Sequence, residues 1–194
     1  MSYKVCRGFD PARRAEAAAL YWQAFGGKLG RVMGPEARAV AYVAQVMRPD
    51  HAFAALAADG TVIGVAGFRS PYGSFVGGGS ADLRGAYGWA GGTLRAGLLA
   101  MLARDIDNDR FLVDGLCVRA DCRGQGIGRA LLEALCNEGR ARGYAQARLD
   151  VVGGNVRARA LYERVGFVAA GQTCSRVTGV LFGFQTVTIM VRPL

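Results

Sequence analysis

A segment with three alternating glycines carries the clearest chemical pattern in this sequence. It begins where a predicted strand ends, contains Gly124, Gly126 and Gly128, and leads directly into a predicted helix. Glycines let the backbone turn sharply and expose its N–H groups. A helix N-terminus adds unpaired N–H donors and about half a positive elementary charge. The segment is therefore expected to bind an anion such as a diphosphate.

Two commoner phosphate-binding patterns do not fit this segment. The pattern G-x-x-x-x-G-K-[ST] requires a lysine, which the segment lacks. The dinucleotide fingerprint G-x-G-x-x-G requires a small last residue, where this chain has Arg129 or Leu131, depending on the starting glycine. Asp150 lies at about the distance along the chain expected for a ribose contact, but one acidic residue is weak support.

A single acidic side chain, Asp114, interrupts the apolar run at residues 111–118. Strand alternation predicts that Leu112, Asp114, Leu116 and Val118 share one face, with Cys117 on the other. A carboxylate in such a strand is costly unless it has a task or a partner. Burial would raise its pKa toward that of a useful base. Three roles stay open: a general base, a ligand for a cationic group, or the structural partner of an arginine.

Periodicity and turn signals predict the elements that position these residues. Strands are predicted at 3–9, 51–56, 61–68, 111–118, 147–152, 167–170 and 182–191, helices at 11–25, 35–47, 126–143 and 155–165, a glycine-punctuated loop at 26–34, and a helical insertion at 70–105. Strands with interleaved helices in this order indicate a mixed α/β sheet.

Two motifs in a fixed order resemble the GNAT acetyltransferase superfamily. The first is [RQ]-x-x-G-x-[GA], read here from Arg123 to Gly128, and the second runs from Asn155 to Phe167, with a strand between them. The resemblance is sharpest over residues 111–167. It implies one domain over residues 1–194 with a mixed, mostly antiparallel sheet, splayed central strands and helices on both faces. It also implies that the longer 70–105 connection shapes an acceptor site.

The resemblance further implies an acetyl-CoA site. The family binds the pyrophosphate on loop amides, and here these belong to Arg123, Gly124, Gln125, Gly126, Gly128 and Arg129. The pantetheine arm would lie between the splayed strands, beside the backbone of Val118 and Leu116. Asn155 matches the side chain that meets this arm, although a plain helix cap is an equal reading. Tyr162 matches the tyrosine beside the cofactor sulfur, and its alternative is a core aromatic.

The activity implied is transfer of an acetyl group from acetyl-CoA to a primary amine by direct attack in a ternary complex. Tyr162 would protonate the leaving thiolate, and Asp114 would accept the amine proton, alone or through water. A non-catalytic acyl-CoA-binding or sensing protein is the alternative. The acceptor, a small molecule or a protein amine, is left open. The oligomeric state is also left open, with a homodimer as one possibility because dimers are frequent in the family.

The composition of the chain argues against several other classes of protein. The 194 residues carry 24 Lys and Arg against 15 Asp and Glu, a net charge of +9, which favours an anionic ligand. No continuous basic run with interleaved aromatics supports nucleic-acid binding. No apolar run reaches the roughly 18 residues of a membrane span, and no secretory signal is predicted. Five scattered cysteines and one histidine argue against a metal site and favour a cytoplasmic location.

Overall fold

The structure, a computed structural model, describes residues 2–101 and 109–194, so Leu102 and the rest of the predicted insertion to residue 105 lie outside the described residues. The strands are β1 (Tyr3–Arg7), β2 (Ala52–Ala57), β3 (Val62–Ser70), β4 (Gly73–Ser74), β5 (Phe111–Val118), β6 (Gln146–Val152), β7 (Val168–Cys174) and β8 (Thr186–Pro193). The α-helices are α1 (Arg14–Met33), α2 (Glu36–Val46), α3 (Ser80–Tyr87), α4 (Trp89–Ala100), α5 (Ile127–Ala141), α6 (Val156–Arg164) and α7 (Arg176–Phe182).

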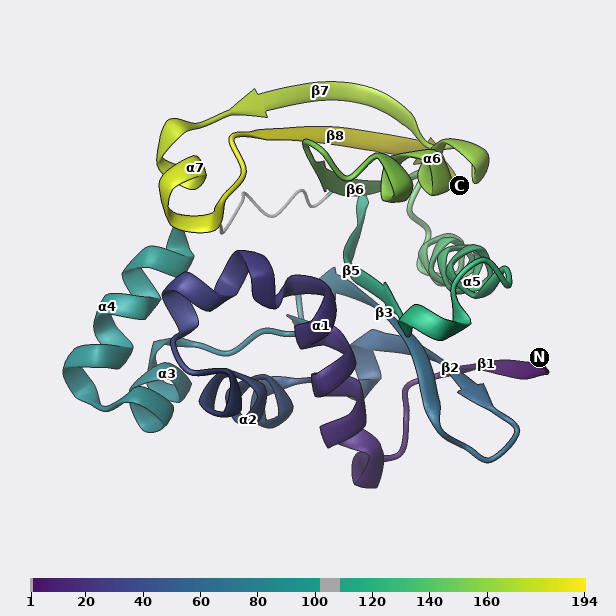
Figure 1. Ribbon diagram of the computed structural model, residues 1–194. Coiled ribbons are helices and arrows are strands. Elements are labelled where there is room, and N and C mark those ends of the chain that lie inside the picture. Colours follow the sequence, from purple (N-terminus) through teal and green to yellow (C-terminus); the bar gives the residue numbers. More distant parts are fainter. Residues whose placement is uncertain (1, 102–108) are drawn as a thin grey trace.

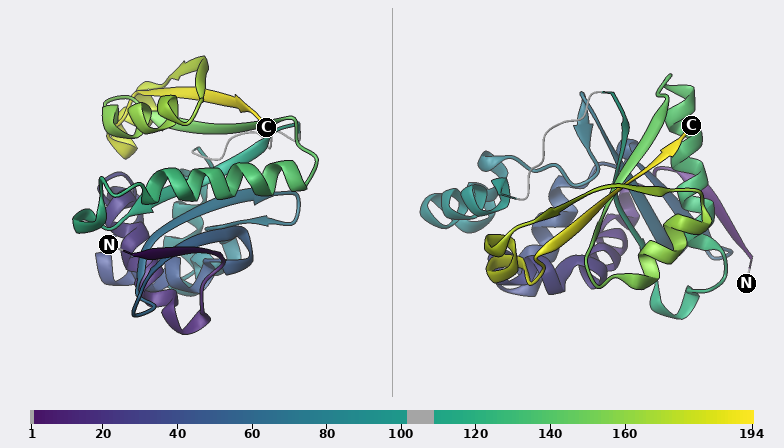
Figure 2. Two further views of the ribbon diagram at one scale, coloured as in Figure 1. Left: turned by 90° about the vertical axis from the view of Figure 1, so that its right-hand side faces the viewer. Right: turned by 90° about the horizontal axis from the view of Figure 1, so that it is seen from above.

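The strands form one sheet in the order β1-β2-β3-β5-β6-β8-β7, with β4 paired to β3. β5 and β6 pair in parallel, whereas the other recorded pairs are antiparallel. α1 and α2 cover one face, and α5 covers the other (Figures 1 and 2). Two apolar clusters fill these two layers. The predicted mixed, mostly antiparallel sheet with helices on both faces is confirmed.

The central parallel pair separates almost at once. In this pair Phe111 lies opposite Ala147 and Leu112 lies opposite Arg148. Both strands continue beyond these residues without pairing to each other. β5 continues on β3, while β6 continues on β8. Because the two strands diverge after their first residues, a gap opens between them, as Figure 1 shows. The predicted splay of the central strands is confirmed.

A β-bulge in β5 overturns the predicted alternation. Val113 pairs with Phe68 and Leu116 with Ala66, so two residues of β5, Asp114 and Gly115, oppose the single residue Gly67. Gly115 takes a φ of +89°, which glycine adopts at little cost. Because of the extra residue, the side chains that follow the bulge face the opposite side of the sheet from the one that simple alternation predicts.

As a result, the side chains of β5 sort differently from the prediction. Leu116 and Val118 pack with α5, whereas Cys117 packs with α1. Asp114 and Cys117 both act on the pKa of Tyr21, a residue of α1. The expectation that Asp114 shares a face with Leu116 and Val118, opposite Cys117, was therefore wrong.

The first helix is longer than predicted. The expected loop at residues 26–34 belongs to α1, which ends where Gly34 adopts a φ of +76°. Its glycines lower helix propensity, but tertiary packing overrides that preference. A Cβ added at Gly26 would lie 2.8 Å from the Trp22 indole, so this glycine makes room for a buried ring.

The described part of the insertion folds mainly into helices, and the C-terminal region contains one further helix between its two strands. The insertion contains α3 and α4, which confirms its predicted helical character. α7 was not predicted. It begins after Ser175, whose hydroxyl accepts a hydrogen bond from the Thr178 N–H, and it delays the last strand from residue 182 to Thr186. A side chain at the N-cap explains this start.

Alanine substitutions at the neighbouring glycines Gly26 and Gly27 of α1 distinguish the effect of packing from the effect of helix propensity. Gly27→Ala should stabilise the protein by roughly 0.5–1 kcal/mol, because a Cβ there meets no described heavy atom within 4 Å. Gly26→Ala gains the same propensity but must displace the Trp22 ring, so it should destabilise by about 1–3 kcal/mol. Urea unfolding of both variants measures the difference. Equal effects would show that Trp22 does not depend on Gly26.

Candidate active site

The glycine loop, residues 123–128, forms the entry to α5. Gly124 and Gly126 adopt φ values of +80° and +82°. Gly126 occupies the N-cap position and has no side chain to fill it. Ala130 N–H donates to Gly126 O at 3.0 Å. The backbone N–H groups of the residues just before Ala130 belong to the first turn, whose N–H groups have no acceptor within the helix itself. The loop thus has the sharp glycine turns and the helix start on which the prediction of an anion site rests.

The polar side chains of the loop are exposed and partly engaged. Arg123 Nε donates to Val118 O at 3.0 Å, across the end of β5. Gln125 Nε2 donates to Asp121 O at 3.5 Å. Arg129 is exposed on the first turn of α5. Two guanidinium groups therefore flank the helix start and add positive potential where an anion would bind.

The gap beside β5 is lined by aliphatic side chains at its glycine-loop end. Leu116 and Val118 pack near Gly128, where an added Cβ would lie 3.8 and 3.9 Å from their methyl carbons. The same Cβ would lie 3.0 Å from Leu161 Cδ2 of α6. Gly128 thus lets α5 and α6 approach each other closely beside the diverging strands.

The first turn of α6 is capped by Asn155, whose Oδ1 accepts from Ala158 N–H at 3.2 Å. The capping reading of this residue is therefore confirmed, and a cofactor contact stays a prediction.

Tyr162, on the same helix, packs with the α5-side cluster and lies 6.3 Å from the Phe167 ring, centroid to centroid. Burial, with a smaller effect from nearby Cys117, raises the pKa of Tyr162 to about 12. The phenol therefore keeps its proton at neutral pH.

Asp114 lies on the α1 side of β5 in a largely apolar setting. Its side chain is 26% exposed, and Oδ1 lies 3.8 Å from Arg69 Nη2. Oδ2 is buried and has no hydrogen-bond partner within the described residues. Burial raises the pKa of Asp114, and the Arg69 guanidinium only partly opposes the rise. An acid with a raised pKa and an unsatisfied oxygen is a proton acceptor of useful strength.

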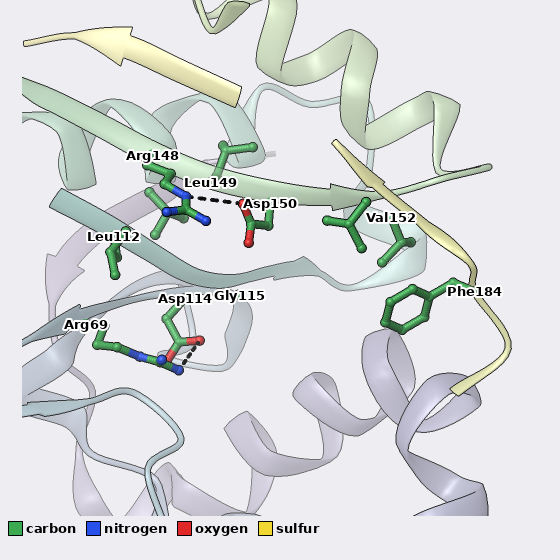
Figure 3. A pocket seen from close by; sticks show the side chains of 11 residues that line it. Arg69, Leu112, Asp114, Gly115, Arg148, Leu149, Asp150, Val152 and Phe184 are labelled. Carbon is green, nitrogen blue, oxygen red and sulfur yellow. Dashed lines mark hydrogen bonds and ion pairs between the residues drawn. The ribbon is translucent and has the colours of Figure 1, made fainter. Parts of the chain in front are cut away.

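A cavity of about 240 Å³ opens beside Asp114, between β5 and β6. Figure 3 shows Arg69 and Asp114 at one end, the Arg148–Asp150 pair above them, and Phe184 at the other end. Arg148 Nε lies 3.5 Å from Asp150 Oδ1. The cavity thus combines apolar walls with two ion pairs.

The structure brings the predicted residues to one gap but on two sides of the sheet. The glycine loop, Leu116, Val118 and Tyr162 lie on the α5 side, and Asp114 lies on the α1 side. Sequence reasoning missed Arg69, Arg148 and Phe184 as pocket residues. No local motif marks them, because β3, β6 and the loop before β8 converge only in the folded sheet.

The described part of the chain contains no group of three or more His, Cys, Asp or Glu side chains arranged to hold a metal ion. The five cysteines are free thiols, and one of them, Cys174, is exposed. Across residues 2–101 and 109–194, no helix is both long and apolar enough to span a bilayer.

Comparisons with known proteins identify similar chains. The model of the "Acetyltransferase (GNAT) family" matches residues 15–167. A [ribosomal protein bS18]-alanine N-acetyltransferase of Escherichia coli K12 is 44% identical over 59 residues, which are 30% of this chain and 40% of that enzyme. A mycothiol acetyltransferase of Beutenbergia cavernae is 48% identical over 52 residues, 27% of this chain and 18% of that protein.

The solved N-acetyltransferase from Staphylococcus aureus Mu50 shares the fold. It superposes with a TM-score of 0.67 at 17% identity, covering 97% of this chain and 99% of that one.

The raised pKa of Asp114 has a consequence for stability. The folded protein stabilises the protonated form of Asp114 relative to the carboxylate. The contribution of this acid to the free energy of unfolding is therefore fully present below the unfolded pKa of about 3.9, and it is lost as pH rises through the folded pKa. Asp114→Asn should therefore unfold at a higher temperature than the wild type at neutral pH. The difference should close as the pH falls toward about 4. Thermal unfolding across this pH range measures it.

Asp50→Asn is the matched control with the opposite sign. The Arg48 hydrogen bond lowers the Asp50 pKa to about 2, so its contribution is present above the unfolded pKa and is lost as pH falls. This variant should be less stable than the wild type at neutral pH. An Asp114→Asn variant that behaves in the same way would contradict the buried-acid assignment.

Proposed function

Because the chain belongs to the GNAT acetyltransferase family, we propose that it transfers an acetyl group from acetyl-CoA to a primary amine. The single observation that supports this most strongly is the gap between β5 and β6. It has the glycine loop at one end and the Asp114 cavity on the opposite side of the sheet. A donor and an acceptor can therefore approach the same point from two directions.

The residues present fit the acetyl donor. The N–H groups of the glycine loop and the first turn of α5 would hold the diphosphate, through Arg123, Gly124, Gln125, Gly126, Gly128 and Arg129. The fit is supported by Gly124, where an added Cβ meets no described heavy atom within 4 Å. The pantetheine arm would lie along the free edge of β5, beside Leu116 and Val118, and near Asn155.

The proposed reaction begins with loss of a proton from the ammonium form of the acceptor, which gives the neutral amine. Asp114 Oδ2, buried and without a described partner, is the acceptor for that proton, directly or through one water. Its raised pKa makes it a better base than an exposed carboxylate. The nitrogen of the neutral amine then forms a bond to the acetyl carbon, the carbon–sulfur bond breaks, and the second proton of the nitrogen passes to water.

Tyr162 is proposed to donate a proton to the departing sulfur. Its pKa of about 12 keeps the phenol neutral and therefore able to donate at the start of each turnover. The phenol then regains a proton from solvent. Tyr162 and Asp114 would thus act on the leaving group and the nucleophile from opposite sides of the gap.

Direct attack is favoured over an acetylated enzyme thiol. Cys117 lies on β5 next to Leu116, but burial raises the pKa of its thiol to about 12. Its Sγ donates a hydrogen bond to Val65 O at 3.7 Å. A protonated, buried thiol is a poor nucleophile. The enzyme would instead hold both reactants in one ternary complex and gain from their proximity.

A non-catalytic acyl-CoA binder would need the glycine loop but not the Asp114 cavity. The buried carboxylate beside this cavity therefore favours the enzyme. The remaining parts of the proposal are a cytoplasmic location, supported by five free thiols, and a homodimer. The dimer is supported by β7, whose seven exposed residues form an edge of the sheet.

Two substitutions separate the proposed roles. Tyr162→Phe should lower kcat by about 100-fold or more while leaving the affinity for acetyl-CoA nearly unchanged, because only the proton donor is removed. Asp114→Asn should also lower kcat by about 100-fold and should remove the acidic limb of the pH–rate profile, since the base no longer titrates. Release of free CoA thiol measures the rate, and calorimetry measures the affinity.

Tyr144→Phe is the control for loss of a phenol hydroxyl, because Tyr144 packs against Phe111 away from the glycine loop. It should keep wild-type turnover. Unchanged turnover in Tyr162→Phe would remove Tyr162 from the mechanism, and an unaltered pH profile in Asp114→Asn would make Asp114 a structural residue.

A further inference from the structure

The acceptor side of the proposed site contains a lysine that the reaction does not use. Lys28 is one of two lysines in the chain and lies half-buried on α1. Tyr21, Phe25 and Lys28 are spaced at i, i+4 and i+7, so they lie along one face of the helix. The names of the two relatives state different acceptors, so this chain's own residues must indicate the acceptor class.

The contacts of α1 place this face against the cavity. The Phe25 ring lies 3.6 Å from the position of a Cβ at Gly115, a residue that lines the cavity. Lys28 Nζ lies 5.6 Å from the centroid of that ring. One turn later, Arg31 Nη1 donates to Val180 O of α7 at 3.0 Å.

α7 leads directly into Phe184, at the end of the cavity away from Arg69 in Figure 3. Along α1, Lys28 therefore lies between Phe25, which contacts the cavity at Gly115, and Arg31, which contacts α7. α7 is the helix that leads to Phe184 at the far end of the cavity.

The charge of Lys28 is not matched by the protein around it. Within residues 2–101 and 109–194 no carboxylate is recorded as an ion-pair partner of Lys28, and burial lowers the pKa of its ammonium group. Contact with the Phe25 ring offsets this cost only in part. A bound anion would stabilise the charged form, because an opposite charge nearby favours it.

Resting on the proposed acetyl transfer, we infer that the acceptor is an amine that also carries an anionic group, a carboxylate or a phosphate. The amine lies at Asp114, and the anionic group lies at Lys28. The charged residues that line the cavity balance, with Arg69 and Arg148 against Asp114 and Asp150. Lys28 is not part of the lining but lies beside it on α1, so it adds an unbalanced positive charge that disfavours a polycationic acceptor. The small cavity, about 240 Å³, suits a compact acceptor of this kind.

Matched amines that differ in charge test this inference. The anionic probes are the ω-amino carboxylates from glycine to 6-aminohexanoate and O-phosphoethanolamine. The neutral probes are the amides of these carboxylates and, for O-phosphoethanolamine, ethanolamine. Putrescine is the cationic probe. Steady-state release of CoA thiol gives kcat and KM for each. The wild type should favour at least one anionic probe over its neutral counterpart by about 10-fold or more in kcat/KM. A preference for O-phosphoethanolamine over every carboxylate would assign the anionic group as a phosphate.

Three variants test whether Lys28 binds the anionic group of the acceptor. Lys28→Gln should raise KM for the preferred anionic probe by about 10-fold with little change in kcat, because binding and not chemistry is affected. Lys28→Arg should retain the preference. Lys4→Gln, at the other lysine of the chain, exposed on β1, should behave as the wild type. Thermal unfolding confirms that each variant is folded.

Three results would overturn the inference. They are equal or better turnover of the amides or putrescine, a Lys28→Gln variant that behaves like Lys4→Gln, and no turnover of any anionic probe. Failure of the proposed function gives a different result, because then no amine of any charge releases CoA from acetyl-CoA.

Discussion

The early divergence of β5 from β6 is the constraint on which the site depends. Parallel strands that remained paired to their ends would fill the space between Val118 and Val152 with ladder hydrogen bonds. Because pairing stops after Leu112, one edge of β5 is left open in the middle of the sheet, where a buried backbone edge must find another partner. A ligand arm with amide groups is such a partner. The same divergence places the start of α5 at the mouth of the gap and leaves the cavity beside Asp114 on the other side.

The bulge at Asp114 and Gly115 turns this gap into a two-sided site. Without the extra residue, Asp114 would point the same way as Leu116 and Val118, toward the face that α5 covers. With it, the carboxylate lies near Tyr21 and Arg69 on the α1 side. The proposed proton acceptor, Asp114, and the proposed proton donor, Tyr162, therefore lie on opposite faces of the sheet. Gly115 makes this possible through its φ of +89° and the close approach of Tyr21 and Phe25.

The sequence predicted those features that local patterns encode. The strand at residues 111–118, the helix after the glycine loop and the Asn155 cap follow from apolar runs, glycines and capping chemistry. Three features could not be predicted in this way. α1 continues past Gly26 because its last turns pack on other elements, through Met33 in the core and the Arg31 bond to α7. The bulge depends on the register with β3, and the Arg69 and Phe184 walls come from segments far apart in the chain. Each is set by tertiary contact, which single-residue propensity does not contain.

The most direct test of the account is a calorimetric titration of the wild-type protein with acetyl-CoA and with acetyl-pantetheine, which has the same arm and thioester but lacks the diphosphate and the adenosine 3′-phosphate. Acetyl-dephospho-CoA, which keeps the diphosphate but lacks the 3′-phosphate, is the control and should bind nearly as tightly as acetyl-CoA. If the N–H groups at the start of α5 bind the diphosphate, acetyl-CoA should bind at least about 100-fold more tightly, the value of two charge-assisted hydrogen bonds. Equal affinity for the two compounds, or no heat with millimolar acetyl-CoA, would contradict the central claim.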